Sequence, residues 1–199
     1  MIKNRQSIRL KNYDYSKSGL YFVTVCTQNR ECLFGDVIDE KMILNEFGKI
    51  IDNVFKLLLN RHEQIKLDVY QIMPNHIHMV IQIVGAGFMP ARDERATTRV
   101  APTLGDIIGA FKSLTTHEYI LNVKNNGWKP FDIRLWQRNY YEHIIRSKTD
   151  LDKIREYIRT NPQMWDRDRN NPKFKRAATQ VKTLYNDGVV RFGPATGSP

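Results

Sequence analysis

The chain alternates between two spacings of apolar residues. The stretch GLYFVTVCTQ, residues 19–28, is rich in β-branched and aromatic residues and predicts a strand. From Asn45 the period changes to steps of three and four, which predicts an amphipathic helix with Asn45 as its N-cap. The apolar face of this helix is Phe47, Ile50, Ile51, Val54 and Leu58. Two further strand-like runs, 66–73 and 77–84, surround the turn signal PNH.

The second half of the chain continues this pattern. T-x-x-D, from Thr103 to Asp106, is typical of a capping box and predicts the start of a second helix. The buried face of that helix is expected to be Leu104, Ile107, Ile108, Phe111 and Leu114. NYYEHIIR, 139–146, predicts a last strand, and SKTD or TDLD predicts the cap of a third helix that ends at Pro162. The order β-α-β-β-α-β-α indicates an α+β fold, a ferredoxin-like βαββαβ sandwich with an additional C-terminal helix.

The composition of the segments outside the predicted strands and helices indicates where the domain begins and ends. We predict one domain over residues 1–165, which includes a basic N-terminal arm (1–12) and a mobile, positively charged loop (85–102). A polar, basic segment follows and predicts a C-terminal tail over 166–199. A length of 199 residues is sufficient for one such core.

The net charge of the chain indicates which class of partner it binds. Lysine and arginine outnumber the acidic residues 31 to 21, for a net charge of +10. Such an excess favours a nucleic-acid partner, although a basic solvent-exposed surface has the same composition. No apolar run is long enough for a membrane span, and the N-terminus has no apolar secretory region. Cys26 and Cys32 are too few for a disulfide framework, so we expect a cytoplasmic protein.

Two histidines stand one residue apart in MPNHIHMVI. Alternate residues of a strand face the same side, so His76 and His78 point together and are able to bind one divalent metal ion. A third ligand would come from elsewhere in the fold. The alternative is a pair of hydrogen-bonded histidines on a sheet face. The spacing alone does not decide between the two.

The third helix offers a second set of polar groups. Leu151, Ile154 and Ile158 form its apolar stripe, and Tyr157 and Asn161 lie together beside that stripe, one turn apart. The helix therefore presents a phenol and an amide oxygen on one side. Tyr157 as a boundary residue and Asn161 as a C-terminal cap are the ordinary alternatives.

These segments together resemble a known family. MPNHIHMVI followed by a helix with YIRTNP resembles the single-tyrosine HUH nucleases of the insertion-sequence-200-like transposase superfamily. YFVTVCTQNR, GAGFMPA followed by IIGAFKSLTT, and LWQRNYYEHIIR are similar to one branch, the REP-associated tyrosine transposases. The resemblance spans Tyr13 to Trp165 and leaves out the insert 92–100 and the tail.

The resemblance implies a site and a reaction. In this family the histidine pair and a polar residue four after the tyrosine bind Mg²⁺ or Mn²⁺, which here are His76, His78 and Asn161. Tyr157 would be the nucleophile of a metal-dependent endonuclease and strand transferase. The implied substrate is single-stranded DNA that bears hairpins in repeats, and the implied intermediate is a covalent 5′-phosphotyrosine. The enzyme would act near the bacterial nucleoid, as a monomer or homodimer.

Other residues receive weaker expectations, each with an ordinary structural alternative. Candidate phosphate contacts are Arg92, Arg95, Lys112, Arg138 and Lys148. Trp136, Tyr140 and Tyr141 are candidates for base stacking, and Glu142 and His143 for removal of the phenol proton. A non-catalytic protein that binds hairpins of single-stranded DNA or RNA is the main alternative function. A metal-dependent phosphohydrolase that uses water is another.

Overall fold

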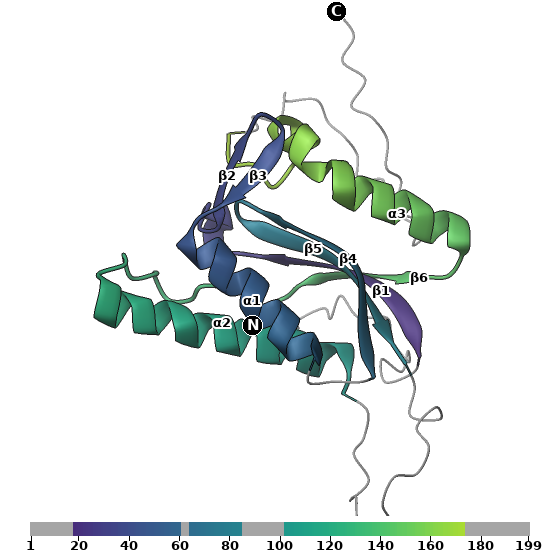
Figure 1. The fold of residues 1–199 in the computed structure, drawn as a ribbon, viewed down its shortest axis with the longest axis horizontal. Coiled ribbons are helices and arrows are strands. Elements are labelled where there is room, and N and C mark those ends of the chain that lie inside the picture. Colours follow the sequence, from purple (N-terminus) through teal and green to yellow (C-terminus); the bar gives the residue numbers. More distant parts are fainter. Residues whose placement is uncertain (1–17, 61–63, 85–101, 174–199) are drawn as a thin grey trace, which may run out of the picture.

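The protein is built on a four-stranded antiparallel sheet (Figure 1). The computed structural model describes residues 18–60, 64–84 and 102–173. The sheet has the strand order β4-β5-β1-β6. Its strands are β1 (Gly19–Cys26), β4 (Ile65–Met73), β5 (His76–Ile83) and β6 (Tyr141–Ile145). Sheet and helices together confirm the predicted α+β class.

Helices cover both faces of this sheet. In Figure 1, α1 (Glu46–Asn60) and α2 (Leu104–Asn126) lie against one face, and α3 (Lys148–Thr160) lies against the other. Short 3₁₀ helices follow β1 and α3, namely η1 (Gln28–Arg30) and η3 (Asn161–Arg167). Within the described residues, no helix is both long enough and apolar enough to cross a membrane.

One element was not predicted from the sequence. A hairpin of β2 (Gly35–Ile38) and β3 (Lys41–Leu44) forms a separate two-stranded sheet. Its two-residue turn places Asp39 and Glu40 at φ values of 48° and 60°, the signs that a type I′ turn requires. Glycine or asparagine normally marks such a turn, so the Asp-Glu pair gave no signal.

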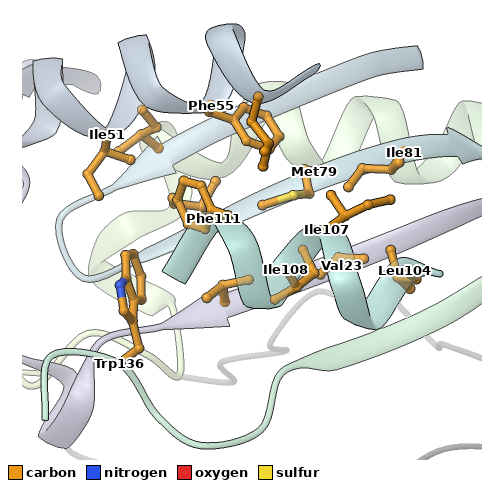
Figure 2. Close-up of a cluster of buried hydrophobic side chains, with 14 of the residues drawn as sticks. Val23, Ile51, Phe55, Met79, Ile81, Leu104, Ile107, Ile108, Phe111 and Trp136 are labelled. Atoms are coloured by element: carbon orange, nitrogen blue, oxygen red, sulfur yellow. The ribbon is translucent and has the colours of Figure 1, made fainter. Parts of the chain in front are cut away.

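The larger core lies between the sheet and the first two helices. Alternation along β1 turns Tyr21, Val23 and Val25 toward this side, where all three are fully buried. Figure 2 shows Ile51 and Phe55 of α1, Met79 and Ile81 of β5, and Phe111, Ile107 and Ile108 of α2 gathered in one cluster. These apolar contacts carry most of the burial in the described part of the fold.

The prediction that Leu114 belongs to the buried face of α2 is wrong. Its side chain is 40% exposed, and Thr115 is buried instead. A period of 3.6 residues turns the contact face from Phe111 to Thr115 and Tyr119. The Thr115 hydroxyl donates to the Phe111 carbonyl and accepts a hydrogen bond from Trp136 Nε1, so a polar residue is satisfied there.

The start and end of α2 and α3 are fixed by local hydrogen bonds. Thr103 and Asp106 form the predicted capping box at the start of α2. For α3, the cap is Ser147, whose Oγ accepts a hydrogen bond from the Asp150 amide at 3.1 Å. The α-helix ends at Thr160, ahead of Pro162.

A smaller apolar cluster holds α3 on the second face of the sheet. Ile154 and Ile158 are fully buried there against Phe22, Val80 and Ile145. An ion pair adds to this contact at the sheet edge, where Arg155 donates two hydrogen bonds to the carboxylate of Asp68, at 2.7 and 2.5 Å. Asp68 lies at an irregularity in β4, between Leu67 and Val69. That irregularity interrupts the regular pairing of β4 with β5.

We predict that Ile154→Ala destabilises the protein by about 2–5 kcal/mol, because it leaves a cavity in the small cluster under α3. Leu114→Ala is the matched control, since its side chain is 40% exposed and its loss should cost within about 0.5 kcal/mol. Urea unfolding of both variants measures the difference. Equal midpoints for the two would contradict the packing described for α3.

Candidate active site

The paired histidines lie on β5, an interior strand of the sheet. His76 and His78 point to the face that α3 covers, and their side chains are almost fully buried. Their Nε2 atoms are 3.0 Å apart. Two adjacent ligands of an octahedral ion at about 2.1 Å would be separated by about 3.0 Å, so this spacing suits chelation of one divalent cation.

A neighbouring side chain fixes the ring orientation and tautomer of His76. The amide Nδ2 of Asn75 donates to the carbonyls of Arg30 and Asn170, at 2.9 and 2.8 Å. Its Oδ1 therefore faces His76 Nδ1, at 2.8 Å, and must accept a hydrogen bond from it. A proton on Nδ1 leaves a lone pair on Nε2, the atom that faces the other histidine. Such an outer partner is typical of metal-binding histidines.

The second histidine has its own outer partner. Thr24 on β1 lies opposite His78 in the sheet register, and its Oγ1 is 2.8 Å from His78 Nδ1. The phenyl ring of Phe22 stacks on the His78 imidazole, with ring centres 5.5 Å apart. Both imidazoles are thus held in place by hydrogen bonds or packing before any ligand binds.

Burial keeps the histidine pair neutral. It lowers the pKa of His76 to about 3, and the charges of Arg169 and Arg30 act in the same direction. Burial also lowers the pKa of His78 well below its usual value, with His76 as the next cause. Neutral imidazole is the form that binds a metal, so the pair is in its ligand form at neutral pH.

Asp168 Oδ2 and Asn161 Oδ1, on or next to η3, are buried oxygen atoms and candidate further ligands. Asp168 Oδ2 is 3.6 Å from His76 Nε2, and the ligating atoms of His76, His78 and Asp168 all lie within 4.8 Å of one another. Neither Asp168 Oδ2 nor Asn161 Oδ1 accepts a hydrogen bond from the described part of the chain. Buried acceptors without a donor are costly, whereas a bound cation would satisfy them. The donor set of neutral nitrogen and oxygen atoms therefore fits a divalent metal ion.

The predicted nucleophile lies directly beside the pair. Tyr157 is on α3, and its Oη is 3.3 Å from His78 Nε2. The ring is half-buried and packs edge-on against Phe22, with centres 6.1 Å apart. The fold thus brings together His76, His78 and Tyr157. Asn161, one turn beyond Tyr157, caps the helix and is buried.

Asp168 is the residue that the sequence analysis missed. It belongs to the segment predicted as a tail, yet residues 166–173 lie within the described fold, and Asp168, Asn170 and Asn171 are buried. The Asn170 amide donates to Asp168 Oδ1 at 2.6 Å, which forms an Asx turn. The spacing of Asp168 and Asn170, which is typical of an Asx turn, was the sequence signal that could have predicted an ordered segment here. Residues 174–199, like the loop over 85–101 and the arm over 1–12, lie outside the described residues.

The residues predicted to contact DNA phosphates differ in their surroundings. Lys112 is directed inward, since its ammonium donates to the carbonyls of Gln137, Arg138 and Asn139 at 2.8 to 3.4 Å. Burial lowers its pKa to about 8. Arg138 and Lys148 are exposed, whereas Arg92 and Arg95 lie outside the described residues. A phosphate contact by any of these five residues stays a prediction.

The candidate stacking and proton-transfer residues mostly have other surroundings. Trp136 is buried in the larger core, while Tyr140 and Tyr141 are half-buried. His143 pairs with Asp150 at 2.9 Å, two turns before Tyr157. Glu142 lies opposite Val23 in register and so faces away from α3. Glu142 therefore does not face the phenol, and the partner of His143 is Asp150, on the same helix as Tyr157.

Comparison with known proteins identifies relatives. One is an "Uncharacterized protein" of Haemophilus influenzae, 38% identical over 175 residues, which cover 84% of this chain and 93% of that protein. Another, from the same organism, is a "Putative REP-associated tyrosine transposase", 27% identical over 77% of this chain and 76% of that protein. No protein-family model matches the chain.

A solved structure shares the fold. It is a REP-associated tyrosine transposase bound to a REP hairpin, with a TM-score of 0.51 and 18% identity, and the match covers 79% of this chain and 73% of that one. The chain thus shares its α+β fold with a solved transposase and part of its sequence with a protein named as one. Within that class, the chain is similar to the REP-associated tyrosine transposases.

We predict that Asn75→Asp lowers the affinity for Mn²⁺ by about 10- to 100-fold, the usual effect of mutating an outer partner of a ligand. The aspartate keeps an acceptor for His76 Nδ1 but places a carboxylate oxygen against the carbonyls of Arg30 and Asn170. Calorimetric titration with Mn²⁺ measures the change. Asn126→Asp, which removes one exposed amide donor at the end of α2, is the control. Identical titrations for the two variants would refute the role given to Asn75.

Proposed function

We propose that this protein is an HUH-class nuclease and strand transferase with a ferredoxin-like fold, which acts on single-stranded DNA that bears hairpins in repeats. The observation that carries the proposal is the position of Tyr157 Oη, 3.3 Å from His78 Nε2, beside two neutral buried imidazoles. A candidate nucleophile and a candidate metal site therefore lie side by side. The related protein bound to a REP hairpin supports the choice of substrate, as does the net charge of +10.

In the proposed reaction the Tyr157 oxygen attacks a backbone phosphorus atom. A bond forms between the phenol oxygen and phosphorus, the bond to the 3′ oxygen breaks, and a 3′ hydroxyl leaves with a proton. The protein then carries a 5′-phosphotyrosine, and attack by another 3′ hydroxyl reseals the strand and frees the phenol. A Mg²⁺ or Mn²⁺ ion held by His76, His78 and a buried oxygen would neutralise the nonbridging oxygens.

Each part of the described site has a task in this scheme. Packing against Phe22 orients the Tyr157 ring, so the phenol is directed toward the histidines with little freedom to rotate. Thr24 and Asn75 keep the imidazoles in place through their Nδ1 atoms. The third ligand has two candidates, Asn161 and Asp168, whose buried oxygens both lack a donor within the described residues.

Two alternatives make different predictions. An RNA-recognition module binds bases on an open sheet face, whereas both faces of this sheet are covered by helices (Figure 1). This observation disfavours a binding module of that kind. A hydrolase that uses water would share the metal site but would leave no DNA on the protein, so a covalent adduct distinguishes it.

We predict that Tyr157→Phe abolishes cleavage and the detergent-resistant protein–DNA adduct but preserves hairpin binding. The substitution removes the hydroxyl alone, and the ring keeps its contacts with Phe22 and His78. The assay incubates the protein with Mn²⁺ and a labelled hairpin strand from the DNA that flanks its gene, then separates the products by denaturing electrophoresis. Tyr141→Phe, in the same apolar cluster, is the control and should retain the adduct. An adduct formed by Tyr157→Phe would eliminate this mechanism.

We predict that the double variant of His76→Ala and His78→Ala loses Mn²⁺ binding measurable by calorimetry. Among the oxygen candidates, Asp168→Ala should weaken binding more than Asn161→Ala, because a carboxylate attracts the cation more strongly than an amide does. Hairpin affinity should change little in all of these variants if phosphate contacts lie elsewhere. Mn²⁺ binding by the double variant at the level of the parent would show that the ligands are misassigned.

A further inference from the structure

Two exposed arginines flank the histidine site. Arg30 follows β1 in η1, and Arg169 follows η3. Arg30 Nη1 donates to the main-chain carbonyl of Arg169 at 2.6 Å, so two segments far apart in sequence meet here. Their positive charges act on His76. The buried, neutral histidine site is therefore bordered by two positively charged side chains, Arg30 and Arg169.

The backbone at both arginines is tied to the histidine site by one side chain. Asn75 Nδ2 donates to the carbonyl of Arg30 and to that of Asn170, while Asn75 Oδ1 accepts from His76. In the Asx turn, Asp168 and Asn170 are buried and Arg169 between them is exposed. The turn thus directs one arginine outward, at a fixed place relative to His76.

Arg30 occupies an unusual backbone conformation. Asn29 and Arg30 have φ values of 56° and 57°, in the left-handed region that costs a residue with a side chain about 1–2 kcal/mol. Strain of this kind is concentrated at functional positions. Within the described residues, the Arg30 guanidinium makes one hydrogen bond, so most of its five N–H donors remain for a ligand.

We propose that Arg30 and Arg169 form a phosphate-binding site that holds the DNA backbone one or more linkages away from the phosphodiester that Tyr157 attacks. Guanidinium groups bind phosphate oxygens through paired hydrogen bonds. The hydrogen bonds from Asn75 to the main chain of Arg30 and Asn170 would fix where these groups lie and so set the register of the strand. The inference rests on the proposed nuclease function for its substrate. It adds a site that the paired histidines, Asn161 and Tyr157 do not supply.

Single substitutions combined with neutral linkages test this site. The probe is the hairpin strand from the DNA that flanks the gene, prepared with one methylphosphonate linkage at successive positions. Arg30→Gln and Arg169→Gln should each weaken binding of the unmodified strand by about tenfold and should lower the dependence of affinity on salt. At one position, the neutral linkage should weaken binding by the parent protein about as much as the arginine substitution does. The same linkage should have little additional effect on the variant that lacks the arginine contacting that position.

The control is Arg159→Gln, an exposed arginine of α3. Both glutamine variants should still bind Mn²⁺ like the parent, which separates this site from the metal ligands. Losses no larger than that of Arg159→Gln, or neutral linkages that act equally on parent and variants, would overturn the proposal. If the parent forms no covalent adduct, the proposed nuclease function fails, while the binding measurements still decide whether these arginines hold phosphate.

Discussion

The carboxamide of Asn75 is the interaction on which the site depends. It is fully buried and makes three hydrogen bonds, one to His76 and two to main-chain carbonyls of other segments. Its main-chain carbonyl also accepts hydrogen bonds from the amide and hydroxyl of Thr27. A buried amide with every group paired is rigid, because each broken bond would leave an unsatisfied donor or acceptor. The end of β1, the start of β5 and the segment after η3 are therefore fixed together.

Coverage of both sheet faces explains the chemistry of the site. The larger core on one side anchors β5 and β1, while the smaller cluster under α3 excludes water from the other side. The histidines lie in this second layer, and the resulting desolvation keeps them uncharged. A cation entering the site would meet two neutral imidazoles and the Asp168 carboxylate with little reorganisation, which favours binding. The same layer holds the Tyr157 ring beside them.

The position of α3 combines apolar packing with an ion pair at the sheet edge. Ile154 and Ile158 supply the packing, and Arg155 joins the helix to Asp68 on β4. The Arg155 contact lowers the pKa of the Asp68 carboxyl, so its contribution to stability is present at neutral pH and is lost as pH falls through that lowered pKa. Within one chain, these contacts place Tyr157 next to the chain's own histidines. The candidate nucleophile and the histidine pair thus lie in one protomer.

The sequence by itself determined the α+β class, the helix caps at Asn45 and Thr103, and the pairing of His76 with His78. These features follow from local rules, because alternation in a strand, the helical period and capping depend on near neighbours alone. Tertiary structure decided the rest. Asp168, Arg30 and Arg169 lie near the histidines because Asn75 joins segments that are distant in sequence. No short-range sequence pattern encodes such a contact. The orientation of Lys112 was likewise set by carbonyls that the fold brings to it.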